Sequence, residues 1–145
     1  MPRMKVVLLV LAMMASLGAG NALAEDRVHA TVDCRAAGQK LAYDCTFKLT
    51  NARTGAALDN ARVTIGADMP SMPMAHNLPP VTATATGAPG EYQARVRLEM
   101  HGDWALHLTV AGALRDQVVE VRNFGEQGSG PPSRKSPKPS GHSKH

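Results

Sequence analysis

The fold of this 145-residue chain is decided by the stretch Glu91-Tyr92-Gln93-Ala94-Arg95-Val96-Arg97-Leu98-Glu99-Met100. Apolar side chains alternate with charged or amide side chains along its whole length. This period of two predicts a β-strand with one face in a core and the other in solvent. After a turn at 101–103 the alternation resumes, with Trp104, Leu106, Leu108 and Val110 on the apolar face. We therefore expect two successive strands joined by a hairpin turn.

The rest of the chain repeats this pattern in shorter pieces. The seven segments that we expect to be strands are 28–34, 42–47, 61–67, 81–86, 91–100, 104–110 and 114–123. Turn residues, mainly glycine, proline and asparagine, separate these segments, and none of the segments shows a sustained helical period. Seven short alternating strands predict an all-β fold, an antiparallel β-sandwich of immunoglobulin-like type.

Residues 1–24 have the features of a secretory signal peptide. Arg3 and Lys5 precede an apolar run, and Ala22-Leu23-Ala24 supplies a small-residue cleavage signal. The run is shorter than the roughly 20 residues needed to cross a bilayer. No cysteine follows the cleavage signal to carry a lipid. We therefore expect a periplasmic protein that keeps no stable membrane anchor after cleavage.

Most of the net charge lies outside the single domain that we expect at residues 25–124. The whole chain carries +4, but residues 25–124 contain ten Lys or Arg against eleven Asp or Glu. The segment 125–145 is rich in Pro, Ser, Lys and Gly, which predicts a disordered basic tail. A nearly neutral domain, in a chain with only 3% aromatic residues, gives no support to nucleic-acid binding.

The two cysteines, Cys34 and Cys45, are predicted to form a structural disulfide. They flank Gly38-Gln39-Lys40-Leu41. A two-residue turn at 39–40 would place them directly opposite each other on antiparallel strands. Disulfides persist in exported proteins. A redox-active pair is the alternative, but the spacing is not Cys-x-x-Cys. Pairing both cysteines also leaves no thiolate for a blue-copper site.

A second unusual stretch is Asp68-Met69-Pro70-Ser71-Met72-Pro73-Met74-Ala75-His76-Asn77-Leu78-Pro79-Pro80. Its prolines remove N–H donors and restrict their neighbours, which predicts a stiff, irregular loop. Thioether sulfur is a soft ligand suited to Cu(I), and imidazole commonly accompanies it. Met69, Met72, Met74 and His76 are therefore candidate copper ligands. The alternative is that the methionines fill an irregular apolar cap.

Two further candidate ligands, Met100 and His101, follow the strand expected at 91–100. If consecutive strands run antiparallel, this strand and the one at 61–67 point the same way. The loops after them would then emerge at one end of the sandwich, where loops from a rigid scaffold usually build a site. The alternatives are that Met100 is the last inward residue of its strand and that His101 is an ordinary turn residue.

Three motifs between residues 63 and 110 resemble the YtkA/FixH-like family of exported β-sandwich domains. They are the Met-Pro loop with Met69, Pro70, Met72, Met74 and His76, then Pro89-Gly90-Glu91-Tyr92, then Met100-x-Gly102-Asp103-Trp104. The resemblance implies an immunoglobulin-like fold and an association with copper handling or copper-enzyme assembly. FixH-type members resemble membrane-anchored proteins, whereas this chain is expected to lose its only apolar segment with the signal peptide.

These observations predict a periplasmic Cu(I) carrier or buffer that hands the metal to a copper efflux or copper-enzyme assembly protein. The alternative is a metal-free interaction module whose Met-Pro loop is an adaptable contact surface. Three thioethers would be wasted on Zn(II) or Cu(II). We do not expect an enzyme, because the sequence has no nucleophile elbow, zinc-protease motif or suitably spaced pair of carboxylates.

Overall fold

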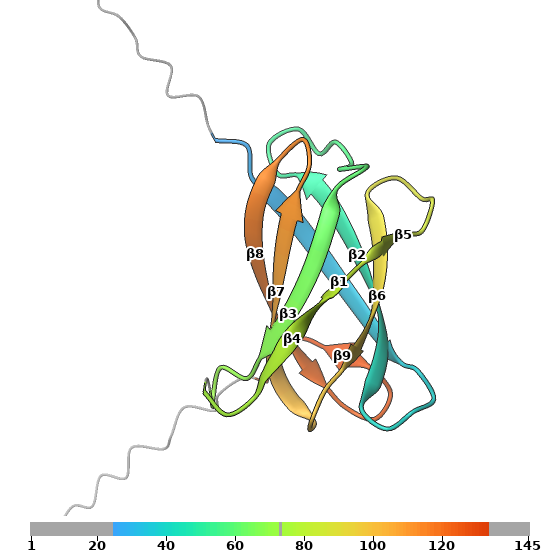
Figure 1. Ribbon diagram of the computed structural model, residues 1–145, viewed down its shortest axis with the longest axis vertical. Coiled ribbons are helices and arrows are strands. Elements are labelled where there is room, and N and C mark those ends of the chain that lie inside the picture. The colour runs from blue at the N-terminus through green and yellow to red at the C-terminus, as the bar shows by residue number, and fades with distance from the viewer. Residues whose placement is uncertain (1–24, 73, 134–145) are drawn as a thin grey trace, which may run out of the picture.

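The computed structural model describes residues 25–72 and 74–133, which form nine β-strands in two antiparallel sheets (Figure 1). The strands are β1 (Val28–Ala36), β2 (Ala42–Asn51), β3 (Arg62–Asp68), β4 (Asn77–Thr82), β5 (Thr84–Ala85), β6 (Glu91–Arg97), β7 (Gly102–Ala111), β8 (Arg115–Phe124) and β9 (Ser129–Gly130). One sheet has the order β1-β2-β6-β5 and the other has the order β4-β3-β7-β8-β9. The expected signal peptide at 1–24 and residues 134–145 lie outside the described residues.

The two sheets enclose a core made by the inward positions of the alternating strands. Phe47 and Leu49 of β2 and Trp104, Leu106 and Leu108 of β7 expose 0% of their surface. The predicted antiparallel β-sandwich is therefore confirmed. Within the described part of the chain, no helix is long and apolar enough to cross a membrane.

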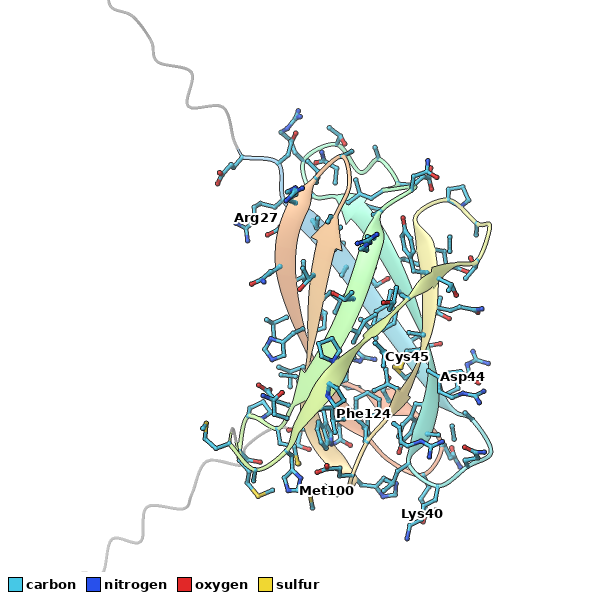
Figure 2. The ribbon with its side chains drawn as sticks, in the orientation of Figure 1. Arg27, Lys40, Asp44, Cys45, Met100 and Phe124 are labelled. Atoms are coloured by element: carbon cyan, nitrogen blue, oxygen red, sulfur yellow. A yellow bond between two sulfur atoms is a disulfide. The ribbon has the colours of Figure 1, made fainter. Side chains whose placement is uncertain are left out.

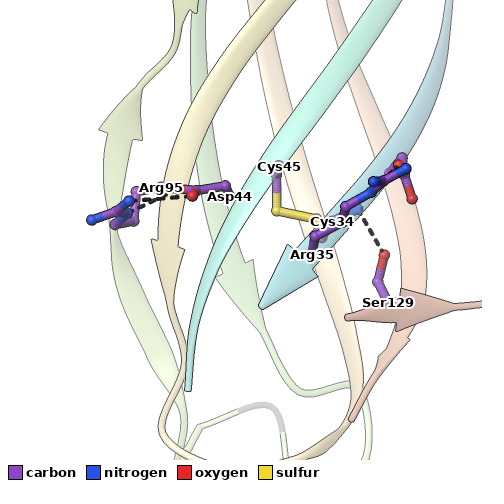
Figure 3. Close-up of a disulfide and its surroundings, with 7 residues drawn as sticks. Cys34, Arg35, Asp44, Cys45, Arg95 and Ser129 are labelled. Carbon is purple, nitrogen blue, oxygen red and sulfur yellow. Dashed lines mark hydrogen bonds and ion pairs between the residues drawn. A yellow bond between two sulfur atoms is a disulfide. The ribbon is translucent and has the colours of Figure 1, made fainter. Parts of the chain in front are cut away.

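The β1–β2 hairpin has the predicted register and carries the predicted disulfide. Cys34 lies opposite Cys45, and the two sulfurs are bonded (Figure 3). The turn itself is longer than the two residues expected. Ala37 N–H donates to the carbonyl of Ala42, and Leu41 has a positive φ of 60° inside the loop. Ala37 and Ala42 still pair on either side of loop residues 38–41, so the register of the two strands is the predicted one.

Removing this disulfide is expected to destabilise the domain by about 3 kcal/mol, because it closes a loop with a sequence separation of 11. Alanine at both positions is the appropriate change, since the side chains of Cys34 and Cys45 are buried. Denaturant unfolding of the double variant and of the oxidised parent measures the difference. Two free thiols in the exported, folded protein would contradict the bridge.

The strand predicted at 91–100 ends three residues early. β6 stops at Arg97, and Leu98 leaves the sheet while its side chain stays buried. β7 pairs with β3 and β8, so the turn at 98–101 crosses from one sheet to the other and the expected hairpin is wrong. Met100 therefore lies outside the strand, with 39% of its surface exposed.

The strand predicted at 81–86 is divided between the two sheets, and its first part begins earlier. β4 includes Asn77-Leu78-Pro79-Pro80, which we expected to belong to the loop, and it pairs only with β3. A register shift between Ile65 and Ala67 of β3 lies opposite the two prolines. Proline is tolerated there because an edge strand at a bulge needs fewer ladder donors than a central strand.

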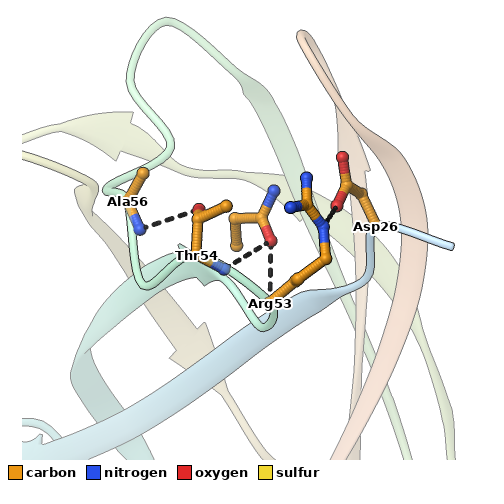
Figure 4. Close-up of polar contacts among 5 residues, drawn as sticks. Asp26, Arg53, Thr54 and Ala56 are labelled. Atoms are coloured by element: carbon orange, nitrogen blue, oxygen red, sulfur yellow. Dashed lines mark hydrogen bonds and ion pairs between the residues drawn. The ribbon is translucent and has the colours of Figure 1, made fainter. Parts of the chain in front are cut away.

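At the upper end of the sandwich in Figure 1, the predicted turn after β2 is closed by side chains. The Asn51 side-chain oxygen accepts hydrogen bonds from the N–H groups of Arg53 and Thr54 (Figure 4). Arg53 also pairs with Asp26, at 2.6 Å between Nε and Oδ1. That hydrogen bond holds the pKa of Asp26 below its ordinary value. The start of the described chain is thereby tied to the turn.

The sandwich continues past residue 124, where we placed the end of the domain. Ala36 N–H donates to the carbonyl of Gln127 at 3.0 Å, and Cys34 N–H donates to Ser129 Oγ at 3.1 Å (Figure 3). Residues 125–133 therefore belong to the sandwich and not to the tail expected from their composition. Hydrogen bonds of backbone and polar side-chain groups hold this segment, and such bonds leave no apolar pattern in the sequence.

Candidate metal-binding site

The Met-Pro loop and the turn after β6 lie at the lower end of the sandwich in Figures 1 and 2. We call this end, formed by residues 69–72, 74–76 and 98–102, the methionine end. His76 on the loop contacts Glu99 on the turn through Nδ1 and Oε2. The structure thus brings the two segments together, as we predicted from strands that alternate in direction.

The loop is compact because it contains two successive turns. Met72 N–H donates to the carbonyl of Met69 at 2.9 Å, and Ala75 N–H donates to the carbonyl of Met72 at 3.1 Å. The turns leave the side chains of Met72 and Met74 outside the core, with exposed fractions of 38% and 95%. Both side chains are therefore accessible from solvent.

Met69 behaves differently from the other two loop methionines. It is only 4% exposed and belongs to the hydrophobic core. A Cβ atom on Gly102, whose φ is +130°, would lie 3.3 Å from its terminal methyl carbon. Met69 thus packs beneath the turn, as the packing alternative expects. Its burial assigns it to holding the loop and the turn together.

Trp104, fully buried at the start of β7, positions both halves of the methionine end. Its indole N–H donates to the carbonyl of Met100 at 3.0 Å. The centroid of its ring system lies 6.2 Å from that of the His76 imidazole, and the two planes meet at 66°. A rigid side chain from the core therefore supports the turn that carries Met100 and the ring of His76.

The contact between His76 and Glu99 orients the imidazole. An ionised carboxylate only accepts hydrogen bonds, so in the neutral ring the proton resides on Nδ1 and the lone pair remains on Nε2. This carboxylate–histidine pairing is the arrangement that usually accompanies a metal-binding histidine. Sequence reasoning missed Glu99, because on the solvent face of a strand it resembled an ordinary charged residue. Its position next to Met100 and His101 was the available signal.

The remaining predicted ligand, His101, is exposed on the same turn. Among the residues described, no group of three or more His, Cys, Asp or Glu side chains is arranged to hold a metal ion. The donors that the methionine end does bring to its surface are the thioethers of Met72, Met74 and Met100 and the imidazoles of His76 and His101. This set is soft, which suits Cu(I) better than a hard or borderline cation.

Asp103 ties the C-terminal segment to the methionine end. Its carboxylate accepts hydrogen bonds from Ser133 N–H at 3.0 Å and from the Asn123 amide at 2.8 Å. The bond from the Ser133 backbone, together with that from Asn123, holds the pKa of Asp103 below its ordinary value. Asp103, the residue after Gly102, therefore anchors the C-terminal segment to the methionine end.

Comparison with known proteins gives one match. The model of a family described as YtkA-like matches residues 27–109, which include both cysteines, the Met-Pro loop and the turn at 98–101. Searches of curated proteins and of solved structures each returned no match.

Proposed function

The chain belongs to the YtkA-like family, and from this premise we propose that it is an exported, periplasmic protein that binds Cu(I) at its methionine end. We infer that it acts as a carrier or buffer for the ion and is not an enzyme. The ion is cargo, which the protein passes to a copper efflux or copper-enzyme assembly protein. The resemblance to copper-handling proteins and the soft donor set support the same assignment.

The observation that carries the proposal is the pairing of accessible thioethers with an oriented imidazole. Met72, Met74 and Met100 expose their side chains at the end of the sandwich where Glu99 contacts Nδ1 of His76, which leaves Nε2 as the ring nitrogen for a metal ion. If the methionines served only to fill space, Met74 would not need to be exposed. The contact between the Glu99 carboxylate and His76 would not be needed either. Thioether sulfur carries no proton, so its lone pairs are available to Cu(I) at every pH.

The exposure of the donors favours transfer over permanent storage. Cu(I) accepts low coordination numbers, so an incoming ligand from a partner can replace one thioether at a time. A structural site would be closed from solvent, whereas Met74 is almost fully exposed. The disulfide between Cys34 and Cys45 supports the proposed periplasmic location, because such bonds persist in oxidising compartments.

Anaerobic titration of the mature chain with Cu(I), in competition with a colorimetric chelator, tests the proposal. We expect one equivalent of Cu(I) to bind and to change the fluorescence of Trp104, the single tryptophan of the chain. Sulfur-edge absorption should change at the same equivalence point. Folded protein that leaves all the Cu(I) on the chelator, with an unchanged sulfur edge, would reject the assignment.

The second candidate function is a metal-free interaction module, favoured by the same exposure of Met74. A flexible apolar side chain in solvent is an adaptable contact for a partner protein. In that case the methionine end would bind a partner in the absence of copper and would be insensitive to the loss of sulfur.

A further inference from the structure

A groove of about 380 Å³ opens between β4 of one sheet and β6 of the other. Its apolar lining consists mainly of Ile65, Ala67, Leu78, Val81, Val96 and Leu98. Arg97 and Glu99 also line it. Glu99 contacts His76, so the groove leads directly to the methionine end.

The groove exists because the chain changes sheets between β4 and β5. β4 pairs with β3 in one sheet, whereas β5 pairs with β6 in the other and covers only Tyr92 and Gln93. In Figure 1, β4 and β6 diverge below β5. Among the described strands, β2 is the only one that forms a hydrogen-bonded ladder with β6 from Ala94 to Arg97. One edge of this half of β6 is therefore open.

The hydrogen bonding of β6 beside β5 shows which of its backbone N–H and C=O groups face the open edge. Thr86 N–H donates to the carbonyl of Glu91, so Glu91 directs its backbone groups toward β5. Successive residues of a strand direct these groups to opposite sides. The N–H and C=O groups of Arg95 and Arg97 therefore face the open edge, which is a template for an added strand.

β4 cannot pair with this edge, because it lies in the opposite sheet and contains two proline residues without N–H donors. A second copy of this chain is also a poor occupant. Antiparallel pairing of two β6 edges about Val96 would place Arg95 opposite Arg97, and like charges directly opposite each other are destabilising.

The charges on β6 favour an acidic segment. Arg95 is already neutralised by Asp44, with 2.9 Å between Nε and Oδ1. Arg97 instead donates to the neutral amide oxygen of Gln39 at 2.9 Å. It has no carboxylate partner among the described residues.

We propose that the open edge of β6 binds an extended segment of a partner protein as an additional strand. Apolar side chains at alternate positions of that segment enter the groove, and acidic side chains between them face Arg97. The far end of the segment lies beside His76 and Glu99. That the partner is the copper donor or acceptor rests on the proposed function, whereas the docking of the strand does not.

The test uses the metal-free mature chain and a fluorescent, capped seven-residue peptide in which valine alternates with aspartate. We expect saturable binding by anisotropy, with amide NMR shifts at Arg95 and Arg97. A matched peptide, methylated on the amide nitrogens that face β6, should bind at least about tenfold more weakly. A peptide in which lysine replaces aspartate should also bind more weakly.

Two protein variants separate charge and metal effects from the strand itself. Arg97→Glu should reverse the preference between the aspartate and lysine peptides, while the control Arg115→Glu, at the exposed first residue of β8, should not. Replacing Met72 and Met74 by leucine should leave peptide binding unchanged, so docking can fail or succeed independently of copper. Binding without shifts on β6, insensitivity to N-methylation, or no saturation up to about 1 mM peptide would overturn the proposal. Self-association through β6 would overturn it as well.

Discussion

Replacing Met72 and Met74 together by leucine is expected to lower the affinity for Cu(I) by at least about 100-fold, which exceeds the usual cost of losing one supporting residue around a metal. Leucine keeps the bulk and apolarity of methionine but removes the sulfur. Both side chains are exposed, so the melting temperature should be nearly unchanged. Competition with a Cu(I) chelator, together with thermal unfolding of the same sample, measures the two quantities.

Met69→Leu is the matched control, because it removes a sulfur of the same loop that lies in the core. We expect its Cu(I) affinity to match that of the parent and its stability to fall by less than about 1.5 kcal/mol. Met100→Leu should weaken binding less than the double change, since it removes one thioether. If the double variant keeps its affinity, ligation by Met72 and Met74 is refuted. If Met69→Leu loses as much affinity as the double variant, the purely packing role assigned to Met69 is refuted.

Truncation after Phe124 is expected to destabilise the domain by about 2–4 kcal/mol, because several hydrogen bonds worth about 1 kcal/mol each are lost. The bonds from Cys34 N–H to Ser129 and from Tyr43 Oη to the carbonyl of Gly125 are among them. The melting temperature should fall by roughly 10 °C or more. Truncation after Ser133 is the control, since it removes none of these contacts. Equal melting temperatures for the two truncations would show that the segment 125–133 contributes no stability.

This difference between the two truncations should depend on pH. Asp103 has a lowered pKa in the folded state because Ser133 N–H and Asn123 donate to it. Its contribution is therefore complete above the ordinary carboxyl pKa of about 3.9. It is lost as the pH falls through the lowered value, because the unfolded chain then binds the proton more readily. The difference in unfolding free energy between the two truncated proteins should become smaller below about pH 4. Denaturant unfolding at a series of pH values measures this difference.

The alternating pattern was sufficient to predict the sandwich, because burial of one face imposes a period of two on each long strand. The same periodicity predicted the pairing of Cys34 with Cys45, which depends on register and tolerates a longer turn. The expected alternation of strand direction placed the Met-Pro loop and the turn after β6 at the same end of the sandwich. These features follow from local patterning, which a single sequence records directly.

The features that were not predicted depend on contacts between distant residues. Burial of Met69 requires the close approach of Gly102, and nothing in the Met-Pro loop distinguishes it from Met72. Glu99 gains its role only when the turn brings it to His76. Residues 125–133 are held by hydrogen bonds to distant residues and not by a buried apolar face. The glycine and proline content of this segment therefore suggested a tail.

The hydrogen bond from Cys34 N–H to Ser129 also bears on the order in which the fold can be completed. These residues are 95 positions apart, whereas the disulfide joins residues only 11 apart. The hairpin of β1 and β2 can therefore close and be oxidised before the later strands have folded. The side of β1 that receives Gln127 and Ser129 stays uncovered until the last part of the domain has folded onto it. A chain that ends before Gln127 is thereby left with an unpaired strand edge on β1.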